Sequence, residues 1–452
     1  MYTVIVRSKK DRDAVNVTIR KYYSEWGIEL LTLKGARTPE KARDLLLDIA
    51  ENSNTFVIVL LGREDREMAR ALNEMLPPTA VAHVVPRARV RNARPATIFK
   101  ETEKARATIR LAAAWDPENN VYVLDRNAGV GLEGYGYSPA YDDFFALGEE
   151  FAVSLGSVLG SKPGLNSLIL RKMGGLHVVY SGKRVFGTLH IPDTGCSPRG
   201  FIRRDVEPID VELNNLLEFN RHVIEGFLKV SLNFLSRFKG AYDTIAVPWS
   251  GGKDSTAALL LALKVFGHKR VIAVYVDTGV DFPQNREYVE KIAKRLSVRL
   301  LSVNVSVRNG LEKEGLPLPT HNNRWCTARK VEALKSALRT LPGRVLVILG
   351  DRDSESEARS RRPPVRSEEG RTLVAPLKQW ATAHVQLFLL MEGVPLNPLY
   401  YVGFYRLGCY ICPALRSWET YLMSKAPCIR DKLGDDPLFR AFMKHRGCED
   451  FI

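Results

Sequence analysis

The sequence predicts an α/β protein whose C-terminal part is a doubly wound, mostly parallel sheet. Three observations support this prediction. Short β-branched runs alternate with amphipathic helical stretches near the N-terminus, a strand-like run at 244–248 enters a helix through a glycine-rich turn, and a buried run at 271–276 ends in an aspartate. Strands that alternate with helices pair in parallel, because each helix returns the chain to the same end of the sheet.

The length and composition are typical of a multidomain globular protein. A chain of 452 residues exceeds one ordinary core, so two or three domains are expected. A hydrophobic content of 45% with 26% charged residues excludes a chain that is mostly disordered. No apolar run approaches the about 20 residues of a spanning helix, and Met1 to Arg7 lacks the layout of a signal peptide. We therefore expect a cytoplasmic protein with no membrane partner.

Four segments are predicted in order along the chain. Residues 1–90 form a small N-terminal α/β domain, with strands at Tyr2–Val6, Ile28–Leu33, Phe56–Leu61 and Thr79–Val85. Residues 91–120 form a basic linker, and residues 121–205, with glycine-rich turns and short β-like runs, form a small β-rich accessory domain for which RNA binding is the candidate role. Residues 206–452 start with a helix and hold the doubly wound domain and a cysteine-rich end.

The net charge of +15 is concentrated in two short segments. The crowded arginines are Arg87, Arg89, Arg91 and Arg94 in the first segment and Arg352, Arg359, Arg361, Arg362 and Arg366 in the second. An excess of this kind favours polyanionic partners, with nucleic acid first and nucleotides second. The alternative is an ordinary solvated surface, such as that of a heat-adapted protein.

The segment from Ser250 to Thr256 has the chemistry of a phosphate-binding loop. Its sequence is Ser250-Gly251-Gly252-Lys253-Asp254-Ser255-Thr256, and a predicted strand precedes it while a predicted helix follows it. The glycines let backbone N–H groups approach an anion, and the helix N-terminus adds partial positive charge. Lys253 offers a point charge, and the hydroxyl groups offer hydrogen bonds. The alternative interpretation is a tight turn that only caps a helix.

Two further segments are expected to lie at the same edge of the sheet. Asp277 ends the predicted strand at 271–276, and Gly350 follows a predicted strand at 345–349. Because ligands of doubly wound sheets bind at the carboxyl ends of the strands, Asp277 is expected to hold a ribose hydroxyl or a metal-bound water. The alternative for Asp277 is ordinary turn chemistry.

Together these motifs resemble the PP-loop ATP pyrophosphatases, and within them the phosphoadenylyl-sulfate (PAPS) reductase-like family. The matching segments are the 250–256 loop, Asp277-Thr278-Gly279, Gly350-Asp351-Arg352 with Ser356 and Arg359, Val374-Ala375-Pro376-Leu377 with Trp380, Asn397-Pro398-Leu399-Tyr400 and Gly403 to Pro413. The resemblance implies an adenine nucleotide alpha hydrolase-like fold that binds ATP and Mg²⁺ and forms an adenylate. It also implies nucleotide binding by Ser250, Gly251, Gly252, Lys253, Asp254, Ser255, Thr256, Asp277 and Gly350 and catalysis by Lys253, Asp254, Arg352 and Arg359.

Two departures from the reductases bear on the reaction. Their loop is typically degenerate, since their nucleotide has no pyrophosphate to lose, whereas the loop here is complete. Their short Glu-Cys-Gly motif near the C-terminus is also missing, because Cys448 lies in the sequence Arg-Gly-Cys-Glu-Asp. We therefore expect ATP as the substrate and assign no catalysis to Cys448.

The cysteines suggest a metal or redox centre rather than a disulfide framework. Cys409 and Cys412 form a C-x-x-C pair, and Cys326 lies upstream after Trp325. Iron–sulfur reductases that this chain resembles carry a Cys-Cys pair there, so three ligands of a [4Fe–4S] cluster would remain. Cys428 could complete a four-thiolate cluster or a zinc site. The alternatives are a cluster held by three cysteines, a structural zinc knuckle, or plain thiols.

The function predicted from these features is ATP-dependent adenylation of an RNA acceptor, such as a tRNA, followed by sulfur transfer. The second prediction is sulfonucleotide metabolism, either reduction of PAPS or adenylyl sulfate or adenylylation of sulfate. The third is a nucleic-acid-binding protein that senses a nucleotide without cleaving it. The sulfur donor is not identified by the sequence, and a homodimer is the candidate assembly.

Overall fold

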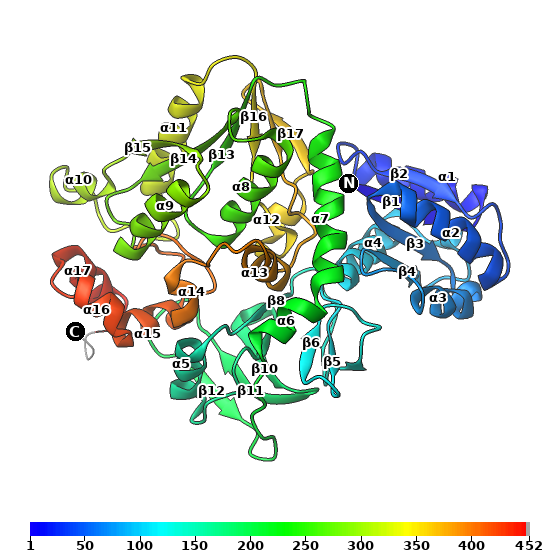
Figure 1. Ribbon diagram of the computed structural model, residues 1–452, viewed down its shortest axis with the longest axis horizontal. Helices are drawn as coiled ribbons and strands as arrows, with labels where there is room; N and C mark the ends of the chain where they lie inside the picture. Colours follow the sequence, from blue (N-terminus) through cyan, green and yellow to red (C-terminus); the bar gives the residue numbers. More distant parts are fainter. Residues whose placement is uncertain (449–452) are drawn as a thin grey trace.

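The computed structural model describes residues 1–448, apart from the side chains of residues 47, 48 and 50–53. The chain forms an N-terminal α/β domain, a β-rich middle region and a C-terminal α/β domain (Figure 1). The long helix α7 (Arg221–Ser236) stands between the first and the third of these parts. Within the described residues, none of the helices combines the length and apolar character needed to cross a membrane.

The N-terminal domain is a four-stranded parallel sheet in the order β2-β1-β3-β4. Its strands are β1 (Tyr2–Val6), β2 (Glu29–Thr32), β3 (Phe56–Leu61) and β4 (Ala80–Val84), and its helices are α1 (Lys9–Tyr22), α2 (Pro39–Ser53), α3 (Arg66–Asn73) and α4 (Pro95–Arg110). The middle strand β3 is buried along its whole length, as its unbroken apolar sequence requires.

Helix α4 replaces much of the basic linker predicted for residues 91–120. Pro95 occupies its first turn, where the missing N–H costs nothing. Arg106 and Arg110 are buried in this helix, Arg106 in an ion pair with Asp353 and Arg110 donating to the carbonyl of Pro139. The arginines therefore anchor α4 to other parts of the chain, and the segment is not a solvated connection.

The middle region contains β-strands, as predicted, and its strands pair antiparallel. A five-stranded sheet has the order β12-β11-β10-β9-β8, and a small sheet beside it has the order β6-β5-β7. The elements are β5 (Ala114–Asp116), β6 (Val121–Val123), β7 (Val130–Gly131), β8 (Asp142–Phe145), α5 (Glu149–Leu159), β9 (Leu168–Arg171), β10 (Leu176–Ser181), β11 (Arg184–His190) and β12 (Arg199–Ile202). Helix α6 (Leu213–Phe219) then leads into α7.

The C-terminal domain confirms the predicted doubly wound sheet. Its strand order is β15-β14-β13-β16-β18-β17, and every neighbouring pair is parallel except β17 with β18. The strands are β13 (Thr244–Pro248), β14 (Val271–Asp277), β15 (Arg299–Asn304), β16 (Val345–Ile348), β17 (Val365–Glu368) and β18 (Arg371–Val374). The helices are α8 (Lys253–Phe266), α9 (Pro283–Arg295), α10 (Val307–Glu312), α11 (Trp325–Arg339), α12 (Glu357–Ser360), α13 (Thr382–Met391), α14 (Pro398–Val402), α15 (Ser417–Lys425), α16 (Pro427–Leu433) and α17 (Pro437–His445).

One hydrophobic core connects the N-terminal and C-terminal domains through α7. Phe227 of α7 meets Phe56 of β3 at a ring-centroid distance of 5.0 Å and Trp380 at 5.9 Å. The buried cluster to which they belong extends from Met1 to Tyr400. The C-terminal domain is thus built against the rest of the chain, and its nucleotide side is positioned partly by residues from outside it.

Candidate nucleotide site and thiol cluster

The 250–256 loop lies at the carboxyl end of β13, next to the centre of the sheet. Strand β13 pairs with β14 on one side and β16 on the other, and the loop passes from β13 into the first turn of α8. The carboxyl ends of neighbouring strands surround it, which is where doubly wound sheets bind ligands. The predicted strand–turn–helix context is therefore present.

Two glycines allow the close backbone contacts that shape this loop. Gly251 has a φ of +74°, and a Cβ atom there would lie 2.4 Å from Oδ1 of Asn285. A Cβ atom on Gly350 would lie 2.7 Å from the carbonyl carbon of Asp254, so the segment after β16 touches the first turn of α8 directly. A larger residue at either position would displace the loop.

The serine hydroxyls of the loop face one another at its exposed end. Ser250 is exposed, and its Oγ lies 3.2 Å from Oγ of Ser255. Thr256 is instead fully buried, where its Oγ1 donates to the carbonyl of Gly252 and accepts a hydrogen bond from Nε1 of Trp249. Ser250 therefore offers the exposed hydroxyl of the loop, whereas Ser255, which donates to the carbonyl of Gly252, and Thr256 hold the shape of the loop.

Three residues outside the loop brace its backbone. Asn285 donates from Nδ2 to the carbonyl of Ser250 at 3.1 Å, and Asn397 donates to Oδ1 of Asn285 at 3.0 Å. The hydroxyl of Tyr400 accepts a hydrogen bond from the backbone N–H of Lys253 at 3.0 Å. Asn397 and Tyr400 belong to a motif that the sequence had singled out, but nothing in the sequence marked Asn285.

The side chain of Lys253 is turned inward, which corrects the expectation that it offers a free point charge. Lys253 is 3% exposed. Its Nζ donates to Oδ2 of Asp254 at 2.9 Å and to the carbonyl of Tyr405 at 3.2 Å, and it lies above the ring of Tyr400. In this arrangement the ammonium contributes positive electrostatic potential to the site, and it fixes the carboxylate of Asp254 by a hydrogen bond.

Arg352 is also committed to internal partners. It is 3% exposed. Its Nε donates to Oδ1 of Asp254 at 2.6 Å, its Nη1 to Oδ2 of Asp142 at 3.1 Å, and its Nη2 to Oγ1 of Thr382 at 2.8 Å. Burial favours the neutral form of Asp254, but Arg352 and Lys253 outweigh it and lower the pKa of that carboxyl. The structure therefore places Arg352 as a clamp on Asp254, and its predicted catalytic role stays a prediction.

Arg359 is the predicted catalytic arginine that reaches solvent. Its side chain is 39% exposed, pairs with Glu355, and places Nε 3.6 Å from Oδ1 of Asp351. Burial disfavours the charge of Arg359, but Glu355, Asp351 and, more weakly, Asp254 raise its pKa. Arg362 and Arg366 also reach Asp351, so the Arg-rich segment is gathered around one carboxylate beside the 250–256 loop.

Asp277 lies at the end of β14, as predicted. Its Oδ1 accepts a hydrogen bond from the N–H of Gly279 at 2.9 Å, and its Oδ2 pairs with Arg286 of α9. These contacts hold the carboxylate at the strand end. Its predicted role toward ribose or a metal-bound water remains a prediction.

Cys326, Cys409 and Cys412 come together around Lys330. Burial disfavours the ammonium, but Cys409, Asp281, Cys412 and Cys326 together raise the pKa of Lys330. The three thiols also pack against one apolar cluster. Cys409 lies 3.3 Å from Oγ1 of Thr278, directly after β14. Burial and then Asp281 raise the pKa of the Cys409 thiol, so it is protonated at neutral pH. The thiols therefore lie on the same side of the sheet as the 250–256 loop.

Cys428 does not join this group. It is exposed on α16, and the charges that act on its thiol are those of Glu150, Asp431 and Lys432. Among the side chains that the structure describes, no three of His, Cys, Asp or Glu are close enough to hold one metal ion. The predicted four-cysteine ligand set is therefore not assembled in this structure.

Cys448 forms a disulfide with Cys196. This bond corrects the expectation that the chain carries no structural disulfide. It links the segment after α17 to the loop after β11, and both of its cysteines are buried. The sequence separation of 252 between the two cysteines left no local pattern that could have indicated the pairing.

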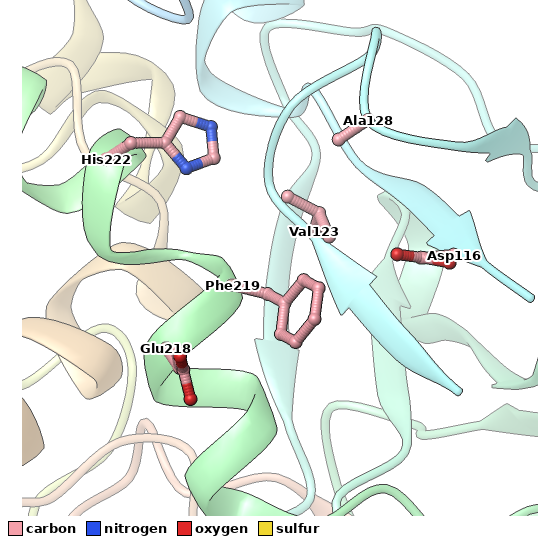
Figure 2. A pocket seen from close by; sticks show the side chains of 6 residues that line it. All are labelled: Asp116, Val123, Ala128, Glu218, Phe219 and His222. Atoms are coloured by element: carbon pink, nitrogen blue, oxygen red, sulfur yellow. The ribbon is translucent and has the colours of Figure 1, made fainter. Parts of the chain in front are cut away.

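A separate hollow lies where β6 and the start of α7 meet (Figure 2). Asp116, Glu218 and His222 are its ionisable lining residues, with Phe219 and Val123 between them. Two carboxylates and no lysine or arginine belong to its described lining, which disfavours a phosphate ligand, so this hollow does not compete with the 250–256 loop as a nucleotide site.

The fold and the loop define a PP-loop-type α/β protein, and comparison with known proteins gives the family. The family described as "Phosphoadenosine phosphosulfate reductase domain" matches residues 244–415. An adenosine 5′-phosphosulfate reductase of Streptomyces coelicolor is 31% identical over 169 residues, which cover 36% of this chain and 69% of that protein. The chain belongs to the PAPS reductase-like family of PP-loop proteins, which is a family of enzymes.

Two other similarities extend this comparison. An uncharacterised protein of Methanocaldococcus jannaschii is 32% identical over 252 residues, or 52% of this chain, and the chain spans 60% of the length of that relative. The crystal structure of a PAPS reductase from Candida auris, in a phosphate complex, is 22% identical and covers 45% of this chain and 98% of its own, with a TM-score of 0.35.

Proposed function

We propose that this protein is an ATP-dependent adenylating enzyme that activates an RNA acceptor, such as a tRNA, for the insertion of sulfur. The observation that carries the proposal is the complete 250–256 loop at the N-terminus of α8, with Ser250 exposed and two glycines at close backbone contacts. Backbone N–H groups and hydroxyls in this arrangement suit the pyrophosphate end of MgATP.

Each part of the site has a separate role in the proposed adenylation. The 250–256 loop holds the β- and γ-phosphates, and the exposed side chain of Arg359 stabilises negative charge on the α-phosphate. Lys253 and Arg352 keep Asp254 ionised and fixed at the base of the loop. An acceptor oxygen bonds to the α-phosphorus while the bond to the bridging oxygen breaks, and pyrophosphate leaves. A hydrosulfide equivalent from a donor then attacks the activated carbon, the carbon–oxygen bond breaks, and AMP leaves.

The acceptor class rests on charge and architecture. The net charge of +15 favours a polyanionic partner. The N-terminal domain and the middle region add surface around the nucleotide side that a small acceptor would not require. The cytoplasmic location and a homodimeric assembly stay predictions.

Sulfur chemistry is supported by the three thiols around Lys330. A [4Fe–4S] cluster held by Cys326, Cys409 and Cys412, or a zinc ion as its alternative, stays a prediction, and no step above passes through it. Iron and zinc analysis of anaerobically purified protein tests it. Iron near four atoms per chain that is lost in Cys412→Ser but kept in Cys428→Ser would support the cluster, and stoichiometric zinc without iron would contradict it.

Reduction of a sulfonucleotide is the second candidate, because curated relatives of this chain include adenosine 5′-phosphosulfate reductases. A nucleotide sensor without catalysis is the third. A single assay with labelled ATP, RNA, adenylyl sulfate and PAPS separates the three candidates. Pyrophosphate release that RNA stimulates supports adenylation, sulfite formation supports reduction, and ATP binding without cleavage supports the sensor.

A matched pair of variants sharpens this assay. Ser250→Ala removes a hydroxyl that is open to the nucleotide, and we expect it to weaken ATP binding by about tenfold, which is the usual effect of one lost hydrogen bond to a charged group. Ser236→Ala removes a hydroxyl that bonds the carbonyl of Leu232 on α7, and we expect no change. Equal behaviour of the two variants would contradict the proposed phosphate site.

A further inference from the structure

A cavity of about 970 Å³ lies where three parts of the chain meet. Its walls come from the end of α1, from α4, from the 137–139 segment of the middle region and from α12. This volume is at the upper end of the roughly 300–1,000 Å³ of ordinary small-molecule sites. The motifs of the nucleotide site do not use this cavity.

Aromatic rings form part of the cavity walls. Tyr22 of α1 and Phe99 of α4 stack with their ring centroids 4.6 Å apart, and both are partly accessible. Tyr137 stands on the opposing segment and is 42% exposed. Tyr23 is buried and touches the ring of Phe99 at a centroid distance of 5.3 Å, and Trp26 packs edge-on against Tyr23. Accessible flat rings on two walls suit a ligand with a planar face.

Cationic side chains accompany these rings. Lys21 and Lys100 are exposed at the cavity, and Nζ of Lys21 lies 5.3 Å from the ring centre of Tyr22. Arg361, directly after α12, contributes a further cation and pairs with Glu357. A stacking platform with exposed lysines at its side matches a ligand that joins a flat base to a negatively charged phosphate.

Helix α12 connects this cavity to the nucleotide site. Glu357, Ser360 and Arg361 line the cavity, while Arg359 of the same short helix reaches Asp351 beside the 250–256 loop. A second connection runs through the wall residue Glu103, which accepts hydrogen bonds from Tyr23 and Arg106. Arg106 in turn pairs with Asp353, next to Arg352. A strand held in the cavity would thus pass close to the site where ATP is cleaved.

We propose that this cavity binds unpaired nucleotides of an RNA strand, with a base stacked on Tyr137 beside the Tyr22–Phe99 pair and phosphates held by Lys21 and Lys100. The assignment deepens the proposed function and rests on it, because it names where the RNA acceptor is held. Single-stranded nucleic acids are bound in this way elsewhere, by aromatic platforms beside positive charge.

The test is binding of a labelled single-stranded RNA of about ten nucleotides, measured by fluorescence anisotropy without ATP at salt concentrations from about 50 to 200 mM. Tyr137→Ala should raise the Kd by about 5- to 150-fold, the range for losing one stacked base, and leave the salt dependence unchanged. Lys100→Ala should weaken binding and reduce the slope of log K against log salt by about 0.7. Both side chains are exposed, so the variants should fold.

Matched controls are Met75→Ala, which removes an apolar side chain that is 36% exposed after α3, and Lys239→Ala, which removes an exposed cation after α7. Variants of the cavity that bind RNA as tightly as these controls would overturn the assignment. The assignment would also be overturned if AMP displaced the labelled RNA as effectively as unlabelled RNA does, since a mononucleotide would then be the ligand. If RNA stimulates pyrophosphate release but Tyr137→Ala binds RNA as the wild type does, the assignment of the cavity is wrong and the proposed function stands. If RNA binding depends on the cavity but no ATP is cleaved, the proposed function is wrong and the assignment of the cavity stands.

Discussion

Arg352 connects Asp254 of the 250–256 loop to Asp142 of the middle region. Its Nε lies 2.6 Å from Oδ1 of Asp254, and its Nη1 lies 3.1 Å from Oδ2 of Asp142. One buried guanidinium therefore couples the nucleotide side of the C-terminal domain to strand β8, which belongs to another part of the chain.

Arg352→Met should be strongly destabilising. The substitution would leave two carboxylates buried without their common counter-ion, which costs about 3–5 kcal/mol in comparable sites. Urea unfolding followed by circular dichroism measures the loss. Arg344→Met, which removes only an exposed pair with Asp243, should change the free energy of unfolding by less than about 1 kcal/mol. Equal effects of the two substitutions would show that the clamp contributes little.

Asp143→Asn should stabilise the protein at alkaline pH. Burial raises the pKa of Asp143 to about 7, against a hydrogen bond from Tyr135 that lowers it. A carboxyl whose pKa is raised on folding contributes stability at low pH and loses it as the pH rises toward and through 7. An uncharged amide avoids this loss, so the variant should exceed the wild type in the free energy of unfolding above pH 7. The gain should vanish near pH 4, and a gain that does not depend on pH would contradict this explanation.

The neighbouring Asp142 should behave in the opposite way. Burial favours its neutral form, but Arg352, Arg171 and hydrogen bonds from Thr382 outweigh burial and lower the pKa of Asp142. A lowered pKa supplies stability above the ordinary value near pH 4 and removes it as the pH falls further. Asp142→Asn should therefore destabilise the protein at pH 7 and approach the wild type in acid, which pH-dependent urea unfolding measures.

Gly350→Ala should damage the 250–256 loop. The new Cβ would lie 2.7 Å from the carbonyl of Asp254 and 2.8 Å from the N–H of Ser255, so the first turn of α8 must move. We expect a loss of about 1–3 kcal/mol in stability and ATP binding that is weaker by tenfold or more, measured by calorimetry. Gly131→Ala meets no atom within 4 Å and should behave as the wild type.

Alkylation should separate Cys428 from the other free thiols. Burial raises the pKa of the Cys409 thiol, so iodoacetamide at neutral pH should modify the exposed Cys428 well before Cys409. If a metal centre is present, Cys326, Cys409 and Cys412 should gain protection together while Cys428 does not. Mass spectrometry of protein prepared with and without chelator measures this. Protection of Cys428 along with the others would restore it as a ligand.

Cys196→Ser should lower stability by about 2–5 kcal/mol, because it removes a disulfide that closes a loop across a sequence separation of 252. Thermal unfolding with and without reductant measures the change. Reductant should lower the Tm of the wild type and leave that of the variant unchanged. Cys428→Ser should unfold as the wild type does.

Local signals were enough to predict much of the C-terminal domain. The bounds of β13 and the presence of a helix after the loop follow from a short apolar run, a glycine turn and an Ala- and Leu-rich stretch, all within two dozen residues. These features need no distant partner, and the structure agrees with them.

Contacts between distant parts of the chain could not be predicted. The brace from Asn285, the pairing of Arg352 with Asp142 and the Cys196–Cys448 bond join residues that have no common motif. The charge pattern also misled in one place. Arg106 and Arg110 look like part of a solvated basic segment, because the groups that pair with them, Asp353 and the carbonyl of Pro139, come much later in the sequence or from another element.

Because Arg352 pairs with Asp142, the C-terminal domain cannot be separated from the middle region without loss of this ion pair. A stand-alone domain starting at residue 206 would keep the guanidinium and lose the carboxylate of β8, along with the aromatic contact that Phe227 makes to Phe56. The arginine of such a piece would lack one of its two carboxylate partners, so we expect the C-terminal domain alone to be less stable than it is within the full chain.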